Sequence, residues 1–496
     1  MSYLSIVLQT LSAFILTRIY LDILGDDGYG LYQMIYAVAQ YILILDLGIS
    51  TVMIRYISEF DATGQKDKIE NFAFHFALIV AAVVIVIAAI GLVVNQRIEN
   101  IYQTLTPDEY AISHKLFRTM IFQLCFTVIS HYFKGVCEAY ERFTFTRIVS
   151  ILQLCLSFVL TVGFLYLGVG VTGIALANTI AIAASTIALA ICAFTKIELR
   201  ICFHHWDFDL LKPAFLLMLA MLLQAVVGHV NGSVDKTILG IMATKKDVTV
   251  YSIAASIITM FNTIPTVISG VFQSEAVRLV AKRADSERLT DFVIRPGRLQ
   301  FMLIGGFLAG FFLLGQDFII CWTDKTSMSA AWGYVLIIMI PNAVPLVQTP
   351  CLSILNAMDK RIYRSIILAG MTGINILLTV ILIRLIGPIG APIATGISYI
   401  IGHCILMNVY YKKRIGLNVR RMFKEITHKT VFCVGIAFAI NLPLMLWRTD
   451  GNWFVLLSKA AVFCVSYGLL LWKVSMNDDE RKMAEIIFAK LRNNLI

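Results

Sequence analysis

The chain has 496 residues, of which 59% are hydrophobic and only 15% are charged, and its formal net charge is +10. An average soluble domain carries about 25% charged residues, so this chain lacks the polar surface that a globular protein of its length needs. The composition therefore excludes an ordinary soluble enzyme and indicates an integral membrane protein. The cysteines are scattered singly without a Cys-x-x-Cys pair, which predicts neither a disulfide framework nor a zinc site.

Apolar stretches of about 20 residues, each long enough to cross roughly 30 Å of hydrocarbon, follow one another along the chain. None of them has the pattern of a cleavable signal peptide. The first also lacks a basic leader, so we expect a cytoplasmic start that is short or trimmed. We predict fourteen transmembrane helices, at residues 3–24, 31–56, 71–95, 114–134, 148–167, 172–194, 213–234, 249–272, 299–320, 331–355, 364–385, 390–411, 430–447 and 453–473.

Lysine and arginine are distributed unequally between the two sets of predicted loops. The loops that share a side with the N-terminus contain 30 of these residues, and the opposite loops contain 7. Because positive charge is retained on the cytoplasmic side, both termini are predicted in the cytoplasm, which requires an even number of helices. The basic net charge is thus attributed to membrane topology, and no nucleic-acid partner is expected.

The two halves of the chain resemble each other at an offset of about 217 residues. Four short segments recur in the same order: 23–25 as 238–240, 58–59 as 274–275, 139–142 as 357–360, and 168–173 as 387–390. Six predicted helices separate equivalent points, so the two halves have the same orientation in the membrane. We predict a six-helix bundle at 1–198, a second at 199–415, an additional helix pair at 416–475 and a cytoplasmic amphipathic tail at 476–496.

Ionisable residues within predicted spans are the candidate functional residues, because a charge in the hydrocarbon region is costly unless it faces a partner or a wet cavity. Arg18 and Asp22 lie one turn apart on one face of the first span, where they could pair or line a cavity. Asp46 lies deep in the second span with no obvious local partner, which favours a cavity role. Asp235 and Lys236 end the seventh span and could equally belong to a loop.

We expect structural roles for the other polar residues in or near the spans. Charged residues close to span ends can extend their side chains to the interface, and histidines within spans are expected to make helix-packing hydrogen bonds. The first group comprises Arg55, Lys115, Arg118 and Lys459, and the second comprises His75, His131 and His403.

Motifs of catalysis are absent from the sequence. It contains no Gly-x-x-x-x-Gly-Lys-Ser/Thr and no His-Glu-x-x-His, so neither a nucleotide-binding loop nor a metalloprotease site is predicted. The longest predicted external loop, about 96–113, is too short to be a catalytic domain. A carrier that needs no cofactor and no metal is therefore expected, and not an enzyme.

Several segments resemble polysaccharide-transport or O-antigen flippases, which belong to the multidrug/oligosaccharidyl-lipid/polysaccharide exporter superfamily. The resemblance covers almost the whole chain, with loose motifs in the family's order. It rests on residues 2–9, 24–32, 45–48 and 55–59 in the first half, and on 234–240, 250–252, 354–357 and 390–395 in the second.

The resemblance implies a V-shaped pair of six-helix bundles with two extra helices that form a groove for a lipid tail. It implies flipping of an undecaprenyl-diphosphate-linked oligosaccharide across a bacterial inner membrane. The repeat unit would belong to an O-antigen, a capsule or an exopolysaccharide. The implied partners are this lipid-linked oligosaccharide and membrane lipids, with the glycosyltransferases and polymerase of the same pathway.

Roles follow for individual residues. Arg18 and Lys236 would bind the diphosphate, since arginine binds phosphate by paired hydrogen bonds. Asp46, Asp22 and Asp235 would couple an ion or line the cavity. A cytoplasmic gate would consist of Arg55, Glu59, Glu275 and Arg278. Two alternatives stay open at this point: a multidrug or small-molecule efflux carrier of the same superfamily, and a non-transporting scaffold of a glycan-synthesis complex.

Overall fold

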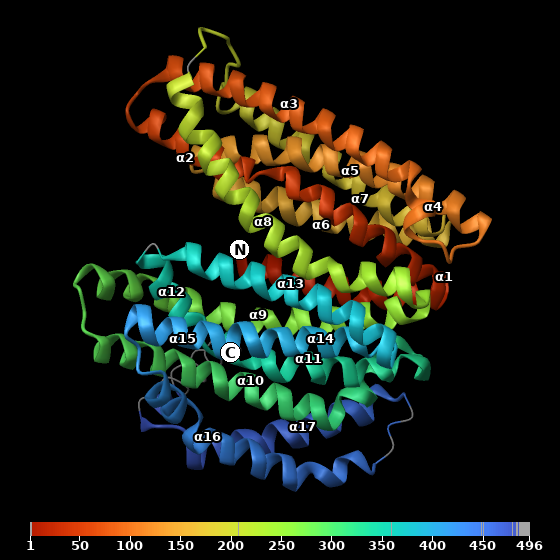
Figure 1. Ribbon diagram of the computed structural model, residues 1–496, viewed down its shortest axis with the longest axis vertical. Coiled ribbons are helices and arrows are strands. Elements are labelled where there is room, and N and C mark those ends of the chain that lie inside the picture. The colour runs from red at the N-terminus through yellow and green to blue at the C-terminus, as the bar shows by residue number, and fades with distance from the viewer. Residues whose placement is uncertain are drawn as a thin grey trace, which may run out of the picture. The chain divides into compact units, whose positions relative to one another are not determined.

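The computed structural model describes residues 2–206, 208–358, 360–447, 449, 451–478, 480–482 and 485, without the side chains of some residues inside the helices. Within these residues all regular structure is helical and no strand occurs, which confirms the predicted all-helical fold (Figure 1). The chain divides into two compact units, Met1–Ser252 and Ile253–Ile496. Each unit is described by itself.

The N-terminal unit is built around one long helix, α5, which packs against α2, α3 and α7, while α1 packs against α6 and α8. The start of α5 is fixed by a capping box between Thr106 and Glu109, with Pro107 in the first turn. The elements of this unit are α1 (Ser2–Ile42), η1 (Leu43–Asp46), α2 (Ile49–Ala62), α3 (Lys66–Gln96), α4 (Ile98–Ile101), α5 (Pro107–Ala139), α6 (Phe143–Tyr166), α7 (Val171–Thr195), α8 (Phe208–Met242) and the beginning of α9 (Lys245–Ala281).

The predicted second span, residues 31–56, is not one continuous helix. α1 passes at Ile42 into the short 3₁₀ turn η1, and Leu47 and Gly48 then take left-handed conformations with φ of 55° and 64° before α2 begins. Glycine is favoured at position 48 for a second reason, because an added Cβ would lie 2.8 Å from Cβ of Met221 on α8. This break is what places Asp46 at a bend.

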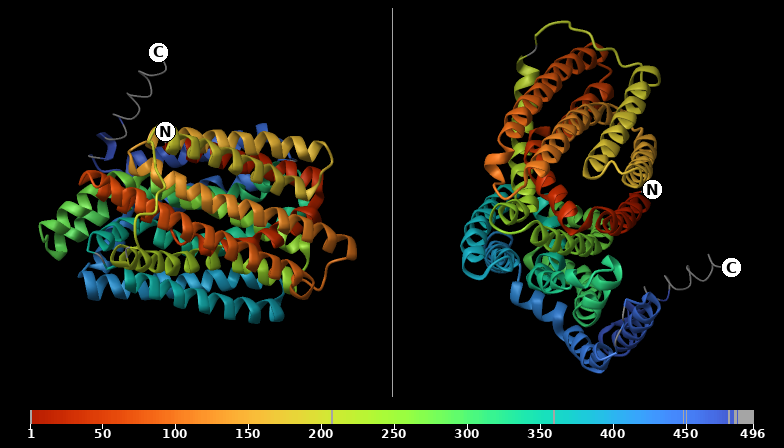
Figure 2. Two further views of the ribbon diagram at one scale, coloured as in Figure 1. Left: turned by 90° about the horizontal axis from the view of Figure 1, so that it is seen from above. Right: turned by 90° about the vertical axis from the view of Figure 1, so that its right-hand side faces the viewer.

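The C-terminal unit is organised around α10, which packs against α11, α16 and α17, while α13 packs against α14. Figure 2 shows its helices from two further directions. Its elements are the rest of α9, α10 (Ser286–Thr323), η2 (Thr326–Met328), α11 (Ala330–Val347), α12 (Thr349–Ala357), α13 (Arg361–Ile386), α14 (Gly390–Tyr399), η3 (Ile400–Met407), α15 (Asn408–Tyr410), η4 (Tyr411–Ile415), α16 (Val419–Asn441), η5 (Leu442–Met445), α17 (Trp453–Leu470) and η6 (Leu471–Ser475).

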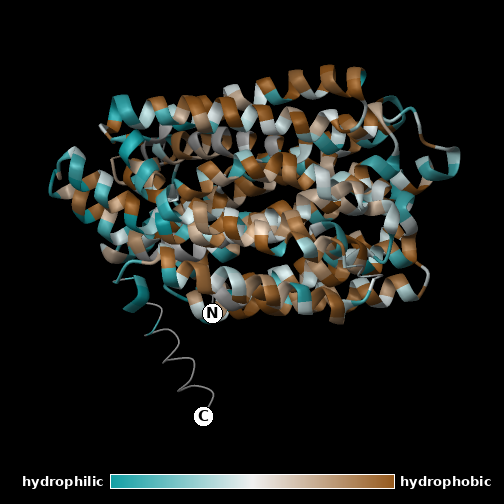
Figure 3. Cartoon of the chain, turned by 90° about the horizontal axis from the view of Figure 1, so that it is seen from below, coloured by the Kyte–Doolittle hydropathy of each residue, from teal (hydrophilic) through white to brown (hydrophobic). Residues whose placement is uncertain are grey.

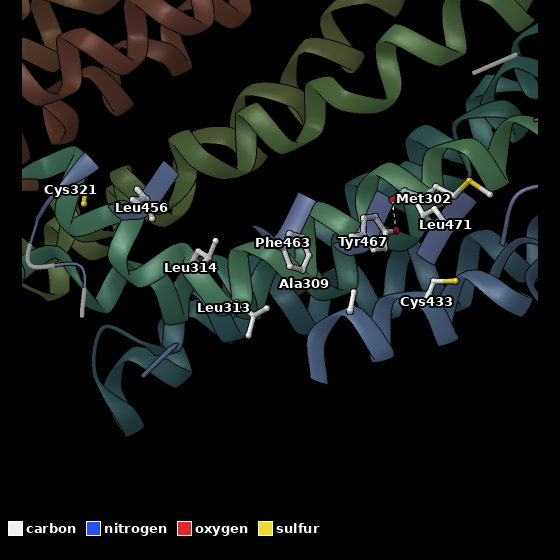
Figure 4. Close-up of a cluster of buried hydrophobic side chains, with 11 residues drawn as sticks. Met302, Ala309, Leu313, Leu314, Cys321, Cys433, Leu456, Phe463, Tyr467 and Leu471 are labelled. Carbon is white, nitrogen blue, oxygen red and sulfur yellow. Dashed lines mark hydrogen bonds between the residues drawn. The ribbon is translucent and has the colours of Figure 1, made fainter. Parts of the chain in front are cut away.

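The last two long helices, α16 and α17, share a hydrophobic core with α10 (Figure 4). Phe463 and Tyr467 of α17 stack with ring centroids 5.9 Å apart, and the Tyr467 hydroxyl donates to the backbone oxygen of Met302 on α10 at 2.7 Å. The ring of Tyr467 fills the space beside Gly306, where an added Cβ would come within 2.3 Å of it. The terminal pair is therefore an integral part of the C-terminal unit.

Large apolar side chains lie on the outside of both units. Leu446 and Phe454 are 86% and 80% exposed, a degree of apolar exposure that a soluble protein avoids over large areas. Figure 3 shows hydrophobic residues along the middle of the helices, with hydrophilic ones gathered towards their ends. The described residues contain 11 helical stretches long and apolar enough to cross a bilayer. The first of these, Ser5–Ala62, has 58 residues, well over twice the length of about 20 residues that one crossing needs.

Each of the fourteen predicted ranges falls mainly on helix, but the number of crossings and the side of the termini stay predictions.

Matched points of the repeat do share a backbone conformation: Gly170 has φ 70° and ψ −152°, and Gly387 has φ 77° and ψ −161°. The predicted boundaries at 198 and 415 concern this repeat and also stay predictions. Most of the predicted tail, 476–496, including its apolar face, lies outside the described residues.

Candidate functional site

Asp46 has a partner that its sequence neighbourhood does not reveal. His131 on α5 is joined through Nδ1 to Oδ1 of Asp46 at 2.7 Å. The side chain of Asp46 is 23% exposed and that of His131 is 33% exposed, so the pair is partly accessible to solvent. His229 on α8 also interacts electrostatically with Asp46. His131, for which we expected only a packing role, is therefore part of the candidate site.

A polar cavity of about 220 Å³ lies beside this pair, enclosed by α5, α6 and α7. A lining so rich in amides and hydroxyls is unusual inside a membrane-spanning bundle, where polar groups are costly unless they have partners or water. Both His131 and Lys134 line this cavity. The lining residues are Gln123, Thr127, Ser130, His131, Lys134, Val149, Ser150, Gln153, Asn178, Ile182 and Leu189.

Arg18 and Asp22 pair with each other on α1. Nε of Arg18 lies 3.7 Å from Oδ2 of Asp22, and the two side chains are 39% and 48% exposed. A half-exposed pair one turn apart contributes little to stability. Of the two roles expected for these residues, pairing with each other is observed, and lining a cavity stays a prediction.

Asp235 and Lys236 lie inside α8 and not in a loop, so the alternative of a loop position is wrong. Lys236 Nζ donates to Oε1 of Gln33 on α1 at 2.9 Å, and Gln33 in turn donates to the Tyr29 hydroxyl at 2.8 Å. Asp235 is buried and accepts from the Tyr251 hydroxyl at 2.5 Å. Asp235 is thus held among protein partners, whereas Lys236 bridges α8 to the polar face of α1.

The predicted gate residues all have exposed side chains. Arg55 on α2 lies over the ring of the adjacent Tyr56 at 5.8 Å. The side chains of Glu59 on the same helix, and of Glu275 and Arg278 on α9, have no hydrogen bond or ion pair with any described residue. Their exposure fits residues that change partners, and the gate itself stays a prediction.

The C-terminal unit contains an apolar groove of about 210 Å³ between α10, α11 and α16. The family resemblance implies that the additional helix pair forms a groove for a lipid tail, and α16 of that pair lines this groove. Its lining consists of Leu308, Ala309, Phe312, Ile340, Val434, Gly435 and Phe438, none of which is polar.

Two buried ion pairs fasten the terminal helices to α10, and the sequence did not predict either. Lys459 of α17 is fully buried and donates to Oδ2 of Asp317 at 2.8 Å, to the Thr449 hydroxyl at 2.7 Å and to the backbone oxygen of Trp447. The expectation that Lys459 extends its side chain to the interface is therefore wrong.

The second pair lies nearer the opposite end of α10. Arg298 donates from Nε and Nη2 to the two carboxylate oxygens of Glu480, at 2.9 and 3.2 Å, and from Nη2 to the backbone oxygen of Ser475 at 2.9 Å. Arg298 and Asp317 are 19 positions apart on α10, which is about 28 Å along a helix. That span is close to the thickness of the hydrocarbon core, so the terminal pair is fastened near both membrane surfaces.

No group of three or more His, Cys, Asp or Glu side chains that could hold a metal ion occurs among the described residues. The candidate residues described above form ion pairs and hydrogen bonds within the helical bundles.

Comparison with known structures shows a shared fold. A structure of the lipid II flippase MurJ, in an inward closed conformation, covers 95% of this chain and 96% of its own, with a TM-score of 0.70 and 13% identity. A multidrug resistance MATE family transporter of the MOP superfamily, in an inward-facing conformation, covers 84% of this chain and 96% of its own, with a TM-score of 0.69 and 17% identity. A MOP superfamily transporter from Pyrococcus furiosus covers 83% of this chain and 94% of its own, with a TM-score of 0.57 and 16% identity.

The fold is thus one that known transporters have, in agreement with the predicted multi-pass helical membrane fold. Among curated proteins no sequence matches the chain significantly. The family model described as polysaccharide biosynthesis protein matches residues 1–273, which is more than half of the chain. The chain therefore belongs to the polysaccharide biosynthesis protein family and has the MurJ-like and MATE-like fold of the MOP superfamily.

Proposed function

We propose that this protein flips a lipid-linked oligosaccharide across a bacterial inner membrane, from the cytoplasmic to the outer leaflet, by alternating access. The substrate would be the undecaprenyl-diphosphate-linked repeat unit of a lipopolysaccharide O-antigen, a capsule or an exopolysaccharide. An ion gradient or the membrane potential would drive the movement. Glycosyltransferases and a polymerase of the same pathway would supply and consume the substrate.

The observation that carries this proposal is the apolar groove lined by α10, α11 and α16, because it offers a long hydrocarbon chain a surface of its own within the C-terminal unit. A water-soluble drug has no need of such a surface. The flippase covers 95% of this chain and the MATE transporter 84%, so more of the chain has a counterpart in the flippase.

For the diphosphate we propose Arg18 and Lys236. Both lie in the N-terminal unit on helices that pack against each other, α1 and α8. Arg18 is half-exposed in its pair with Asp22, and Lys236 has a neutral amide as its hydrogen-bond partner. Arginine and lysine both bind phosphate oxygens through charge-assisted hydrogen bonds.

For the coupling ion we propose Asp46, with Asp22 second and Asp235 third. Asp46 is joined to His131 on α5 at the bend between η1 and α2. A pair of this kind can convert ion occupancy into a change in helix packing at the bend between η1 and α2.

The proposal is tested in cells that lack their own flippase for a matching repeat unit and therefore make no surface glycan. Wild-type protein should restore the glycan, and Arg18→Ala and Asp46→Asn should not, at equal amounts of protein in the membrane. Arg97→Ala is the matched control, because Arg97 is an exposed arginine in the connection before α4. Drug resistance with no effect on surface glycan would show a multidrug carrier instead. Restored glycan in both cavity variants would show that these residues do not have the proposed roles.

A further inference from the structure

The polar cavity of the N-terminal unit contains groups that have no protein partner. Lys134 lines it with a half-buried side chain, yet makes no hydrogen bond or ion pair with any described residue. The side-chain amides of Gln123 and Gln153 line the same cavity and also have no partner among the described residues. Unpaired polar groups within a membrane-spanning bundle cost free energy, so this space is suited to hold a polar ligand.

The lining favours an anion over a cation. None of its residues is a carboxylate: it contains the cation Lys134, the histidine His131, and otherwise neutral amides, hydroxyls and aliphatic groups. The carboxylate joined to Nδ1 of His131, that of Asp46, does not line the cavity. Lysine and amide donors without partners are the groups that bind oxyanions, because hydrogen bonds to a charged acceptor are the stronger ones.

The size of the cavity limits what can occupy it. A volume of about 220 Å³ is smaller than the 300–1,000 Å³ of typical drug-sized sites, and a water molecule occupies about 30 Å³. An oligosaccharide does not fit, whereas one small hydroxylated molecule does. We propose that this cavity is a binding site for a small oxyanion, inorganic phosphate or an acidic monosaccharide, with Lys134 as its counter-charge.

Access to the cavity follows from the positions of its lining on α5. Lys134 and Gln123 are 11 positions apart, which is about 16 Å along a helix and about half of the hydrocarbon thickness. Lys134 lies near the end of α5 that is predicted to be cytoplasmic. The ligand would therefore enter from the cytoplasm and reach the middle of the bilayer. This site does not depend on the proposed flipping, and it differs from the proposed diphosphate site at Arg18 and Lys236.

His131 connects the cavity to the bend between η1 and α2. Its Nδ1 is joined to Asp46, and its Nε2 has no hydrogen-bond partner among the described residues. The ring lines the cavity, so a ligand bound there would lie beside the Asp46–His131 pair.

The test is isothermal titration of the purified full-length protein in detergent at constant ionic strength, with inorganic phosphate, glucuronate and glucose as probes. Wild-type protein should bind one phosphate or one glucuronate and no glucose. Lys134→Gln should weaken binding about tenfold or more, as expected for loss of a charge-assisted hydrogen bond, and Lys134→Arg should retain it. Lys115→Gln is the matched control, because Lys115 is an exposed lysine on the same helix and should leave binding unchanged.

Gel filtration and thermal unfolding show whether each variant is folded. Gln153→Leu, which keeps the charge of Lys134, serves as a second variant if Lys134→Gln does not fold. Glucuronate binding much tighter than phosphate would identify an acidic sugar, and equal binding would identify a general oxyanion site. The proposal is overturned if neither anion binds the wild type, if glucose binds as well as glucuronate, or if Lys134→Gln and Gln153→Leu both bind like wild type. Because no transport is measured, either proposal can fail without the other.

Discussion

Two polar pairs inside the helical bundles differ in how completely the protein surrounds them. In the N-terminal unit, Asp46 and His131 are partly exposed, and His131 lines a polar cavity. In the C-terminal unit, Lys459 is fully buried and three oxygen atoms accept its hydrogen bonds, one of them from Asp317. Burial and the number of protein partners together separate a residue that holds the fold together from one that a ligand can reach.

The largest expected effect is the loss of the fully partnered lysine. Lys459→Ala removes the counter-charge of Asp317 and should lower the free energy of unfolding by about 3–5 kcal/mol, the range for breaking a buried ion pair. Chemical unfolding of the purified protein measures it. Lys473→Ala is the matched control, since Lys473 is exposed and should change stability little.

Replacing both Lys459 and Asp317 separates the loss of the ion pair from the cost of leaving one charge unpaired. Lys459→Met combined with Asp317→Leu leaves no unpaired charge and should recover most of the stability lost in the single variant. If Lys459→Ala is as stable as the wild type, the ion pair between Lys459 and Asp317 does not stabilise the packing of α17 against α10.

An intermediate effect is expected at the bend that positions Asp46. Gly48→Ala places a side chain at φ 64° and within 2.8 Å of Met221, so we expect a loss of about 1–3 kcal/mol from strain and overpacking. Gly64→Ala, at φ 69° with no atom within 4 Å of the added carbon, isolates the backbone contribution. Equal unfolding curves for the two variants would show that contact with Met221 is unimportant.

A smaller effect on stability is expected for Asp46→Asn, which keeps an oxygen that can accept from the His131 ring. The loss should be about 1 kcal/mol, as for one hydrogen bond, while flipping should stop because the charge is gone. Thermal unfolding and a flipping assay on the same preparation measure both. A collapse of stability in this variant would place Asp46 among the structural charges.

The smallest effect is expected for Asp22→Asn. Its pair with Arg18 is half-exposed and one turn apart on α1, so its loss should cost about 0.5 kcal/mol or less. A salt titration of the thermal stability checks the assignment, because a screened pair should contribute still less at high salt. A loss of several kcal/mol would show that Arg18 is held by Asp22 as firmly as Lys459 is held by Asp317.

The helical architecture follows from local information, and most of it could be predicted from the sequence. Apolar length marks the helices, and matched glycines mark the repeat, whose turns at Gly170 and Gly387 share one backbone conformation. The bend after α1 had a usable signal in Leu47-Gly48 directly after Asp46, because glycine within an apolar span indicates a possible break. The predicted continuous helix at 31–56 is therefore wrong at this position, where η1 ends and α2 begins.

The site was less predictable because its partners are far apart in the chain. Asp46 could be identified from its depth, but its partner His131 is 85 positions away, and only packing of α5 beside η1 brings them together. Likewise, Lys459 lies 142 positions from Asp317. Its burial could not be inferred from a position near the end of a span, where an extended side chain explains the sequence equally well.

The central claim is tested most directly by reconstituting purified protein in vesicles that carry a labelled lipid-linked oligosaccharide in one leaflet. Its appearance in the other leaflet is followed with an impermeant reagent. Wild type and the double variant Lys459→Met/Asp317→Leu should flip at similar rates, while Asp46→Asn, although folded, should not flip. The account is contradicted if the wild type does not flip the lipid, or if Asp46→Asn flips normally and the folded double variant does not.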